Sequence, residues 1–209
     1  MTQEENNEDI INGLMPKEAF ERRFSFIADD TLKKNIAITF EYIIFLIEIA
    51  SKEDHKPLIR SSLYKDAAVY TGTVVEACLA YLLRKYLTKY PNQKAKVLEK
   101  EWKTKEFGII HEFSKKKRIR YVVEQSVSVD IGNSPMFAVI NRTCLRAKVL
   151  SKKEFGLAEE IMKARNKIHV SGLKEIDNAY NKETLDAIFD KASKIIKKVE
   201  KKLAKISSN

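Results

Sequence analysis

The stretch from Lys163 to Val170 brings together side chains that suit phosphate chemistry. Arg165 and His169 are four residues apart, so on a helix they would lie on the same face. An arginine keeps its charge and offers a fixed fork of donors to phosphate oxygens, whereas a histidine titrates near neutral pH and can transfer protons. Asn166 lies between them and could position the phosphate or the histidine. The cluster therefore predicts a site that acts on a phosphate group.

Other catalytic signatures are missing from the sequence. It has no glycine-rich phosphate loop, no dinucleotide fingerprint, no paired histidines at metal spacing and no nucleophile elbow, and its six glycines are too few for most of these. Phosphate-loop nucleotide hydrolases, zinc hydrolases and serine hydrolases are therefore disfavoured, and we expect neither a metal nor a cofactor. His55 in a predicted loop and His111 beside Phe113 fit exposed or packed bystanders, so only His169 has neighbours that suggest a task.

The charge of the chain points to an anionic partner. Its formal net charge is +10 with a pI near 9.4, and acidic residues are concentrated in the first thirty positions, so the remaining body is more basic still. Nucleic acid is the first candidate. A lysine-rich run from Lys194 to Lys205 fits either a solvated helix face or a further contact with an anion. The residues that we expect to bind RNA are Lys115, Lys116, Lys117, Arg118, Arg120, Lys163 and Lys167.

The cysteines and the apolar runs bear on where the protein works. Cys78 and Cys144 lie in apolar-periodic segments without partners at metal-ligand spacing, so we expect buried, reduced thiols. The polar, acidic N-terminus does not fit a secretory signal. The strongest apolar run, from Ile36 to Ala50, is short and carries Glu41 and Glu48, which predicts a core helix rather than a membrane span. We expect a soluble cytoplasmic protein with no membrane partner.

Apolar residues recur at three- and four-residue spacing through most of the chain, and this pattern predicts helices. We therefore expect an all-α, up-and-down helical bundle. A stretch rich in β-branched and aromatic residues predicts a short irregular or β-hairpin insertion near 121–135, after an amphipathic segment over 106–120. Residues 1–30 read as a partly disordered N-terminal extension and 31–206 as a single domain. The expected helices cover about 32–51, 58–89, 93–103, 136–150, 151–170 and 182–206.

Local signals indicate where several of these helices begin and how closely they pack. Asp29, Asp30 and Thr31 are good cap residues for the helix that follows them, and Ser151 with Glu154 fits a capping box. Gly72 lies inside a long predicted helix, where glycine costs about 1 kcal/mol relative to alanine, so we expect close helix packing at this position. Phe24 belongs to a short segment that we expect to dock an aromatic face on the body.

The sequence from Ala164 to His169 resembles the signature of HEPN domains (higher eukaryotes and prokaryotes nucleotide-binding). These helical bundles are marked by an arginine, usually followed by a polar residue such as asparagine, and by a histidine shortly after. The segment from Tyr64 to Leu87, which contains Gly72 and Glu76, is similar to the family's long early helix. The run from Ala147 to Ile161 is similar to the approach to its motif.

This resemblance, which covers roughly residues 32–205, implies a metal-independent endoribonuclease. Arg165 would bind the scissile phosphate, and His169 would act as general base on the ribose 2′-hydroxyl or as general acid on the leaving oxygen, with Asn166 as the third site residue. Attack by the 2′-hydroxyl yields a cyclic phosphate, so DNA would not be cut. The family's site is usually composite across a two-fold axis, which implies a homodimer. A toxin or phage-defence effector, held in check by an antitoxin or regulatory protein, would fit this activity.

Two alternatives stay open at this stage. The common catalytic pattern has four to six residues between the arginine and the histidine, whereas three intervene here, and some relatives are non-catalytic modules that bind RNA, nucleotides or proteins. The chain could also be a purely structural helical interaction protein. In the blandest interpretation Arg165 pairs with Glu159, with Glu160 or with an acid on another helix, and His169 caps a helix C-terminus.

Overall fold

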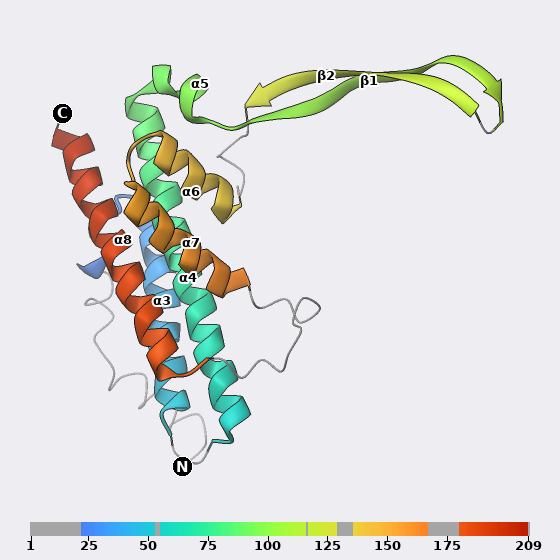
Figure 1. Ribbon diagram of the computed structural model, residues 1–209. Helices are drawn as coiled ribbons and strands as arrows, with labels where there is room; N and C mark the ends of the chain where they lie inside the picture. Colours follow the sequence, from blue (N-terminus) through green and yellow to red (C-terminus); the bar gives the residue numbers. More distant parts are fainter. Residues whose placement is uncertain (1–21, 53–54, 116, 129–135, 167–179, 209) are drawn as a thin grey trace.

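A computed structural model describes the chain outside residues 1–21, 53–54, 116, 129–135, 167–179 and 209. It consists of a bundle of helices from which a long two-stranded β-hairpin projects (Figure 1). The helices are α3 (Asp30–Ala50), α4 (Pro57–Lys89), η1 (Pro91–Gln93), α5 (Lys94–Val97), α6 (Phe137–Arg146), α7 (Lys152–Asn166) and α8 (Lys182–Ser208). The strands of the hairpin are β1 (Lys100–Ser114) and β2 (Lys117–Ser128). The prediction of a mostly helical bundle with a hairpin is confirmed.

Helix α4 is the centre of the bundle and packs against α3, α6, α7 and α8. Its buried residues lie around much of its circumference, as expected for a helix that is covered on several sides. By length and composition α4 could also cross a membrane, but 61% of its most apolar window is buried within the protein. A central position in the bundle therefore accounts for its apolar composition.

The predicted helix starts are confirmed at atomic detail. The backbone N–H of Leu32 donates to Asp29 Oδ1 at 3.0 Å, which caps α3. At the start of α7 the backbone N–H of Ser151 donates to Glu154 Oε2 at 2.6 Å, and the N–H of Glu154 donates to Ser151 Oγ at 3.3 Å. These two reciprocal bonds are the capping box that the sequence predicts, and they fix where the helix that carries Arg165 begins.

The end of the N-terminal extension is docked on the bundle. Phe24 and Ile27 are fully buried, and the Phe24 ring meets the Phe40 ring edge-on at 5.8 Å between centroids. The backbone N–H of Ala28 donates to the hydroxyl of Tyr81 on α4 at 3.0 Å. Aromatic packing therefore joins this segment to α3 and α4, as expected from its apolar side chains. The earlier residues of the extension lie outside the described part.

The β-hairpin starts earlier than the sequence predicts. The expected helix over 93–103 is wrong beyond Val97, because Leu98 turns to an extended conformation and β1 begins at Lys100. The amphipathic segment over 106–120 forms the second part of β1 and the start of β2, and the hairpin ends at Ser128. Most of the segment 121–135, where the insertion was expected, is the second strand, and residues 129–135 are outside the described part. Tyr121 lies over Gly108, where an added Cβ would be 2.5 Å from its ring, so a larger residue there would displace the Tyr121 ring.

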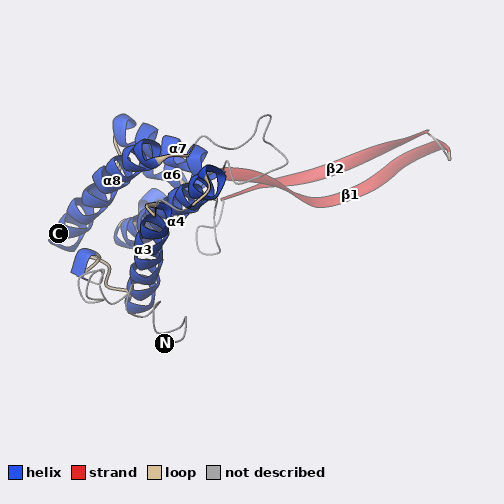
Figure 2. Cartoon of the chain, turned by 90° about the horizontal axis from the view of Figure 1, so that it is seen from below, coloured by secondary structure: helices blue, strands red, loops and turns tan. Residues whose placement is uncertain are grey.

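The hairpin stands clear of the helices. β1 and β2 are antiparallel neighbours with register shifts on the β1 side, and they pair with each other far more than with any helix. Nearly all described side chains of β2 are exposed. Seen from below, the hairpin leaves the bundle beside α6 and extends away from it (Figure 2). We call this element the arm, defined as residues 100–128.

Candidate functional site

Arg165 lies where α7 crosses α4. Its aliphatic stem packs over Gly72, where an added Cβ would be 3.0 Å from Arg165 Cβ and 3.3 Å from Cδ. Its guanidinium Nη1 is 2.9 Å from Glu76 Oε2, one helical turn further along α4. The close packing predicted at Gly72 is confirmed, and its purpose is local: a larger residue would push Arg165 away from the surface of α4.

Glu76 links Arg165 to a third helix. Burial raises the pKa of the Glu76 carboxyl, while the Arg165 guanidinium and a hydrogen bond from the backbone N–H of Phe137 at the start of α6 both act to lower it. The net shift is upward, so at this position desolvation outweighs the attraction of the two partners. The carboxylate therefore connects α4, α6 and α7 at one point, and its side chain is only 18% exposed.

The end of α7 is held by a residue that sequence reasoning did not single out. Tyr180, which is buried, donates from its hydroxyl to the backbone carbonyl of Ala164 at 2.9 Å. This bond satisfies one of the carbonyls that a helix C-terminus leaves unpaired. It fixes the turn that carries Arg165 and Asn166. No local pattern predicts it, because Tyr180 and Ala164 are sixteen residues apart.

The structure describes only some of the other residues of the predicted cluster. Lys163 and Asn166 are exposed on the last turn of α7. Lys167 and His169 lie outside the described residues, so the distance from Arg165 to the histidine is still a prediction. The guanidinium of Arg165 retains donors beyond the one that faces Glu76, and its side chain is 29% exposed, so it can also meet an anion.

The interpretation of Arg165 as an ion-pair partner is confirmed for an acid on another helix and is wrong for Glu160. Glu160 pairs instead with Lys191 on α8 at 2.6 Å, so it is not the partner of Arg165. The acid on another helix is Glu76. This ion pair gives Arg165 a structural role, and it also orients the guanidinium at the surface. The geometry therefore accommodates both a packing role and phosphate binding.

Four of the seven cations that the sequence predicts to bind RNA lie at the tip of the arm. Lys115, Lys117, Arg118 and Arg120 line an open hollow of about 640 Å³ together with Phe113, which the sequence analysis did not assign to binding. Lys116 lies outside the described residues. Within the described part of the chain these four cations have no ion pair with an acid, so their charge is available to an external anion. Proteins that bind single-stranded nucleic acids combine aromatic rings, on which the bases stack, with cations that contact the phosphates.

The structure does not bring the two predicted sets of residues together within one chain. Arg165 lies in the bundle, whereas the basic tip is at the far end of the arm, and both views of the ribbon show this separation (Figures 1 and 2). Lys163 stands near Arg165 on α7, and the tip cations stand apart from both. A single RNA strand would have to span the arm to meet both sets in one protomer.

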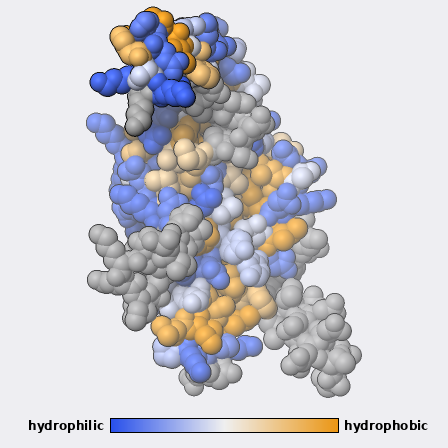
Figure 3. Space-filling view, turned by 90° about the vertical axis from the view of Figure 1, so that its right-hand side faces the viewer, coloured by the Kyte–Doolittle hydropathy of each residue, from blue (hydrophilic) through white to orange (hydrophobic). Residues whose placement is uncertain are grey.

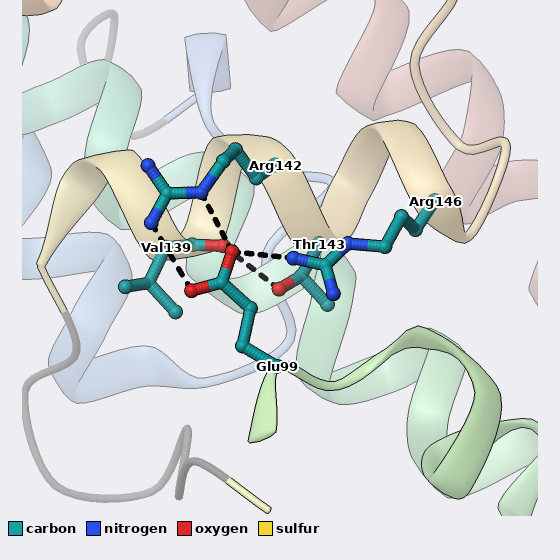
Figure 4. Close-up of polar contacts among 5 residues, drawn as sticks. All are labelled: Glu99, Val139, Arg142, Thr143 and Arg146. Carbon is teal, nitrogen blue, oxygen red and sulfur yellow. Dashed lines mark hydrogen bonds and ion pairs between the residues drawn. The ribbon is translucent and has the colours of Figure 1, made fainter. Parts of the chain in front are cut away.

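A clamp at the root of the arm was missed by sequence reasoning. Glu99, directly before β1, accepts from Arg142 Nε at 2.6 Å and from its Nη2 at 3.1 Å, and it also accepts from Arg146 Nη2 (Figure 4). The bonds from Arg142, with help from Arg146, hold the pKa of the Glu99 carboxyl below its usual range. The clamp ties the arm to α6. Its partners are more than forty residues apart in sequence, so only the fold reveals them.

Among the described residues no group of three or more histidine, cysteine, aspartate or glutamate side chains is arranged to hold a metal ion. Cys78 and Cys144 are both buried and free, and burial raises the pKa of the Cys78 thiol to about 12. These thiols are therefore inert packing groups at neutral pH.

Comparison of the chain with protein-family models, with curated protein sequences and with solved structures finds no match.

Proposed function

We propose that the chain is a metal-independent endoribonuclease of the HEPN type. The observation that carries the proposal is the presentation of Arg165 on the last turn of α7, oriented by Glu76 and directly followed by Asn166 in the motif that ends at His169. A half-buried guanidinium with free donors at the surface is suited to stabilise charge that grows on a phosphate in the transition state. The helical bundle with a long central helix is compatible with this family.

The reaction is transesterification within the RNA. The ribose 2′-oxygen forms a bond to the adjacent phosphorus while the bond from phosphorus to the 5′-oxygen breaks, which leaves a 2′,3′-cyclic phosphate and a 5′-hydroxyl. His169 takes the proton from the 2′-hydroxyl or supplies one to the leaving 5′-oxygen, and Arg165 neutralises the phosphate. As the family resemblance implies, the site would be composite: the motifs of two protomers would meet across a two-fold axis, and each would supply one arginine and one histidine. The protein would act in the cytoplasm as a toxin or defence effector, and an inhibitor protein would control it.

A second candidate is a non-catalytic RNA-binding module. It is favoured by the separation of the basic tip from Arg165, because the tip can bind RNA without any chemistry at α7. It is also favoured by the ion pair with Glu76, which gives Arg165 a structural reason to be present.

Cleavage of RNA in the presence of EDTA tests the proposal. The purified full chain is incubated with single-stranded RNA, alongside Arg165→Ala, His169→Ala and, as a matched control, His55→Ala in the loop before α4. We expect wild type and His55→Ala to release fragments that end in a cyclic phosphate. Arg165→Ala and His169→Ala should lose on the order of 10²–10⁴-fold in rate.

The same assay separates the two candidates. An RNA that carries one 2′-deoxyribose at the cleaved position should resist the wild-type protein at that position. Intact RNA with the wild type, or equal cleavage by His169→Ala, would exclude the nuclease. Salt-sensitive RNA binding without any cleavage would then support the binding module.

A further inference from the structure

The shaft of the arm, between its root and its basic tip, exposes more apolar surface than a solvated hairpin needs. Phe107 is 75% exposed, Ile110 65% and Val122 58%, and further exposed apolar residues of the shaft are Ile109, Ile119, Tyr121 and Val123. A two-stranded hairpin on its own is marginally stable in water. Exposed apolar patches of several hundred Å² on soluble proteins mark surfaces that are covered by a partner. Viewed along the arm from its tip, hydrophobic and hydrophilic side chains stand side by side (Figure 3).

One face of the shaft is already packed on itself. Residues directly opposite in an antiparallel pair share a face, and side chains alternate between faces along a strand. On the face of Tyr121, its ring lies over Gly108 and its hydroxyl donates to Glu106 at 2.6 Å. His111 meets the ring of Phe113 at 4.5 Å between centroids. These side chains have partners within the arm.

The opposite face is open. Phe107 is paired with Val122 across the strands, and Ile109 with Arg120. No register shift falls between Phe107 and Ile109, so all four side chains point to the same side. β2 is regular over this stretch, which adds Arg118 toward the tip and Glu124 toward the root. We call this surface the pairing face, defined by Phe107, Ile109, Arg118, Arg120, Val122 and Glu124.

We propose that the pairing face binds the same face of a second copy of this chain, with the two arms antiparallel. In that arrangement Phe107 and Val122 meet their counterparts near a two-fold axis, because a two-fold interface uses the same patch on both subunits. Arg120 of one arm then lies near Glu124 of the other, because each is two residues from Val122 on β2, so the charges on either side of the apolar centre are complementary. A parallel arrangement would bring the two basic tips together and is disfavoured by repulsion.

The size of the arm allows a contact at the lower end of the range for specific interfaces. The fifteen residues of β1 give a length of about 50 Å, and two strands give a width of about 10 Å. One face therefore offers on the order of 500 Å² before the relief of the side chains is counted, against about 800 Å² per partner in a standard interface. The apolar centre with a charged border is the usual anatomy of such interfaces. Lys115 and Lys117 of the basic tip lie outside the pairing face, whereas Arg118 and Arg120 belong to both surfaces.

This inference concerns a different surface from the nuclease proposal and does not depend on it. The composite site of that proposal needs a dimer through the helices near α7, whereas the pairing face lies on the arm. A chain whose arm pairing is abolished could still cleave RNA, and a chain that never cleaves RNA could still pair through the arm.

Mass measurement by light scattering after size exclusion, on nuclease-treated full-length protein, is the first test. We expect wild type to have at least twice the 24.1 kDa chain mass. Phe107→Ser combined with Val122→Ser should halve the wild-type mass, because it abolishes arm pairing and leaves any contact through the helices near α7 intact. Lys115→Ala combined with Lys117→Ala is the matched control on the same arm and should leave the mass unchanged. Far-UV circular dichroism verifies that the helices persist in each variant.

A crosslinking experiment with an intact apolar face tests the orientation. Arg120→Cys protein is mixed with Glu124→Cys protein under mild oxidation, while the native Cys78 and Cys144 are buried. Antiparallel arms predict the mixed disulfide in excess over either self-linked product. A monomeric wild type, a mass that the Phe107 and Val122 substitutions do not lower, or self-linked products in excess would overturn the inference. A monomer that binds RNA through Phe107 would assign the face to RNA instead.

Discussion

Arg165 and Gly72 are matched to each other, because the arginine stem occupies the space that a side chain at position 72 would fill. Glu76, one turn along the same helix, then receives the guanidinium. The order of these residues along α4 determines how the end of α7 is seated. The position of Arg165 therefore depends on the absence of a side chain at Gly72 as well as on the charge of Glu76.

Two glycine-to-alanine substitutions test this match. Gly156 on α7 has open space around it, so Gly156→Ala should raise the free energy of unfolding by roughly 0.5–1 kcal/mol through helix preference alone. Gly72→Ala has the same intrinsic gain, but its Cβ would press against Arg165 Cβ at 3.0 Å. We expect no net gain there. Urea unfolding with unchanged m-values measures both, and equal gains at the two positions would contradict the match.

At this scale the sequence predicts what is local. The cap at Asp29 and the capping box at Ser151 follow from residues within one turn, and both are present. The need for close packing at Gly72 also follows from helix preference. The identity of its neighbour does not, since Arg165 lies more than ninety residues away and only the packing of α7 on α4 brings it there.

Among the elements, the arm is where sequence patterns are least informative. A helix in the bundle shows its buried stripe, as α8 does with Leu185, Ile188 and Val199. The arm has no buried face in one chain, so burial leaves no alternating pattern to detect. Ile109, Ile110 and Phe113 also fit helical spacing, and this is why the segment before residue 121 resembled an amphipathic helix. The segment nevertheless forms strands, because β1 and β2 pair with each other.

The clamp at Glu99 determines how firmly the arm is attached, and Glu99→Gln tests it. The clamp residues are partly exposed, so global stability should change by less than about 1 kcal/mol. The root of the arm should become more mobile. Trp102, the single tryptophan of the chain, is the third residue of β1 and reports this motion. We expect lower tryptophan anisotropy in Glu99→Gln at pH 7, and no change in Glu112→Gln, which makes the same charge change near the tip.

The pH dependence of this effect follows from the sign of the shift. The folded pKa of Glu99 is lowered relative to an unfolded value of about 4.3, so its stabilising contribution is complete above that value. The contribution is lost as the pH falls through the folded pKa, because the protonated carboxyl no longer pairs with Arg142 and Arg146. The difference in anisotropy between wild type and Glu99→Gln should therefore persist through the pH range in which a glutamate carboxyl ordinarily titrates, and disappear only once the pH is below the lowered folded pKa. A difference that persists below that pKa would show that the clamp does not hold the arm.

For the whole molecule, the excess positive charge is divided between two places. One is the tip of the arm, where the cations have no acidic partner in the described part of the chain. The other is α8, where some lysines pair with acids of α7, as Lys198 does with Glu154 at 2.6 Å, while others face solvent. Net charge in the sequence predicts an anionic partner, but only the fold distinguishes a concentrated patch from a solvated helix face.

The salt dependence of RNA binding distinguishes these two places. Each phosphate contact of a single strand contributes about 0.7 to the slope of log affinity against log salt, so the loss of two contacts should reduce the slope by about 1.4. Lys115→Ala combined with Lys117→Ala removes two tip cations, and Lys197→Ala combined with Lys201→Ala removes two exposed cations of α8 with the same change in net charge. If the tip binds the strand, only the first pair lowers the slope in a titration of labelled RNA. Equal reductions would mean that RNA responds to the overall charge of the protein and has no preferred place on the arm.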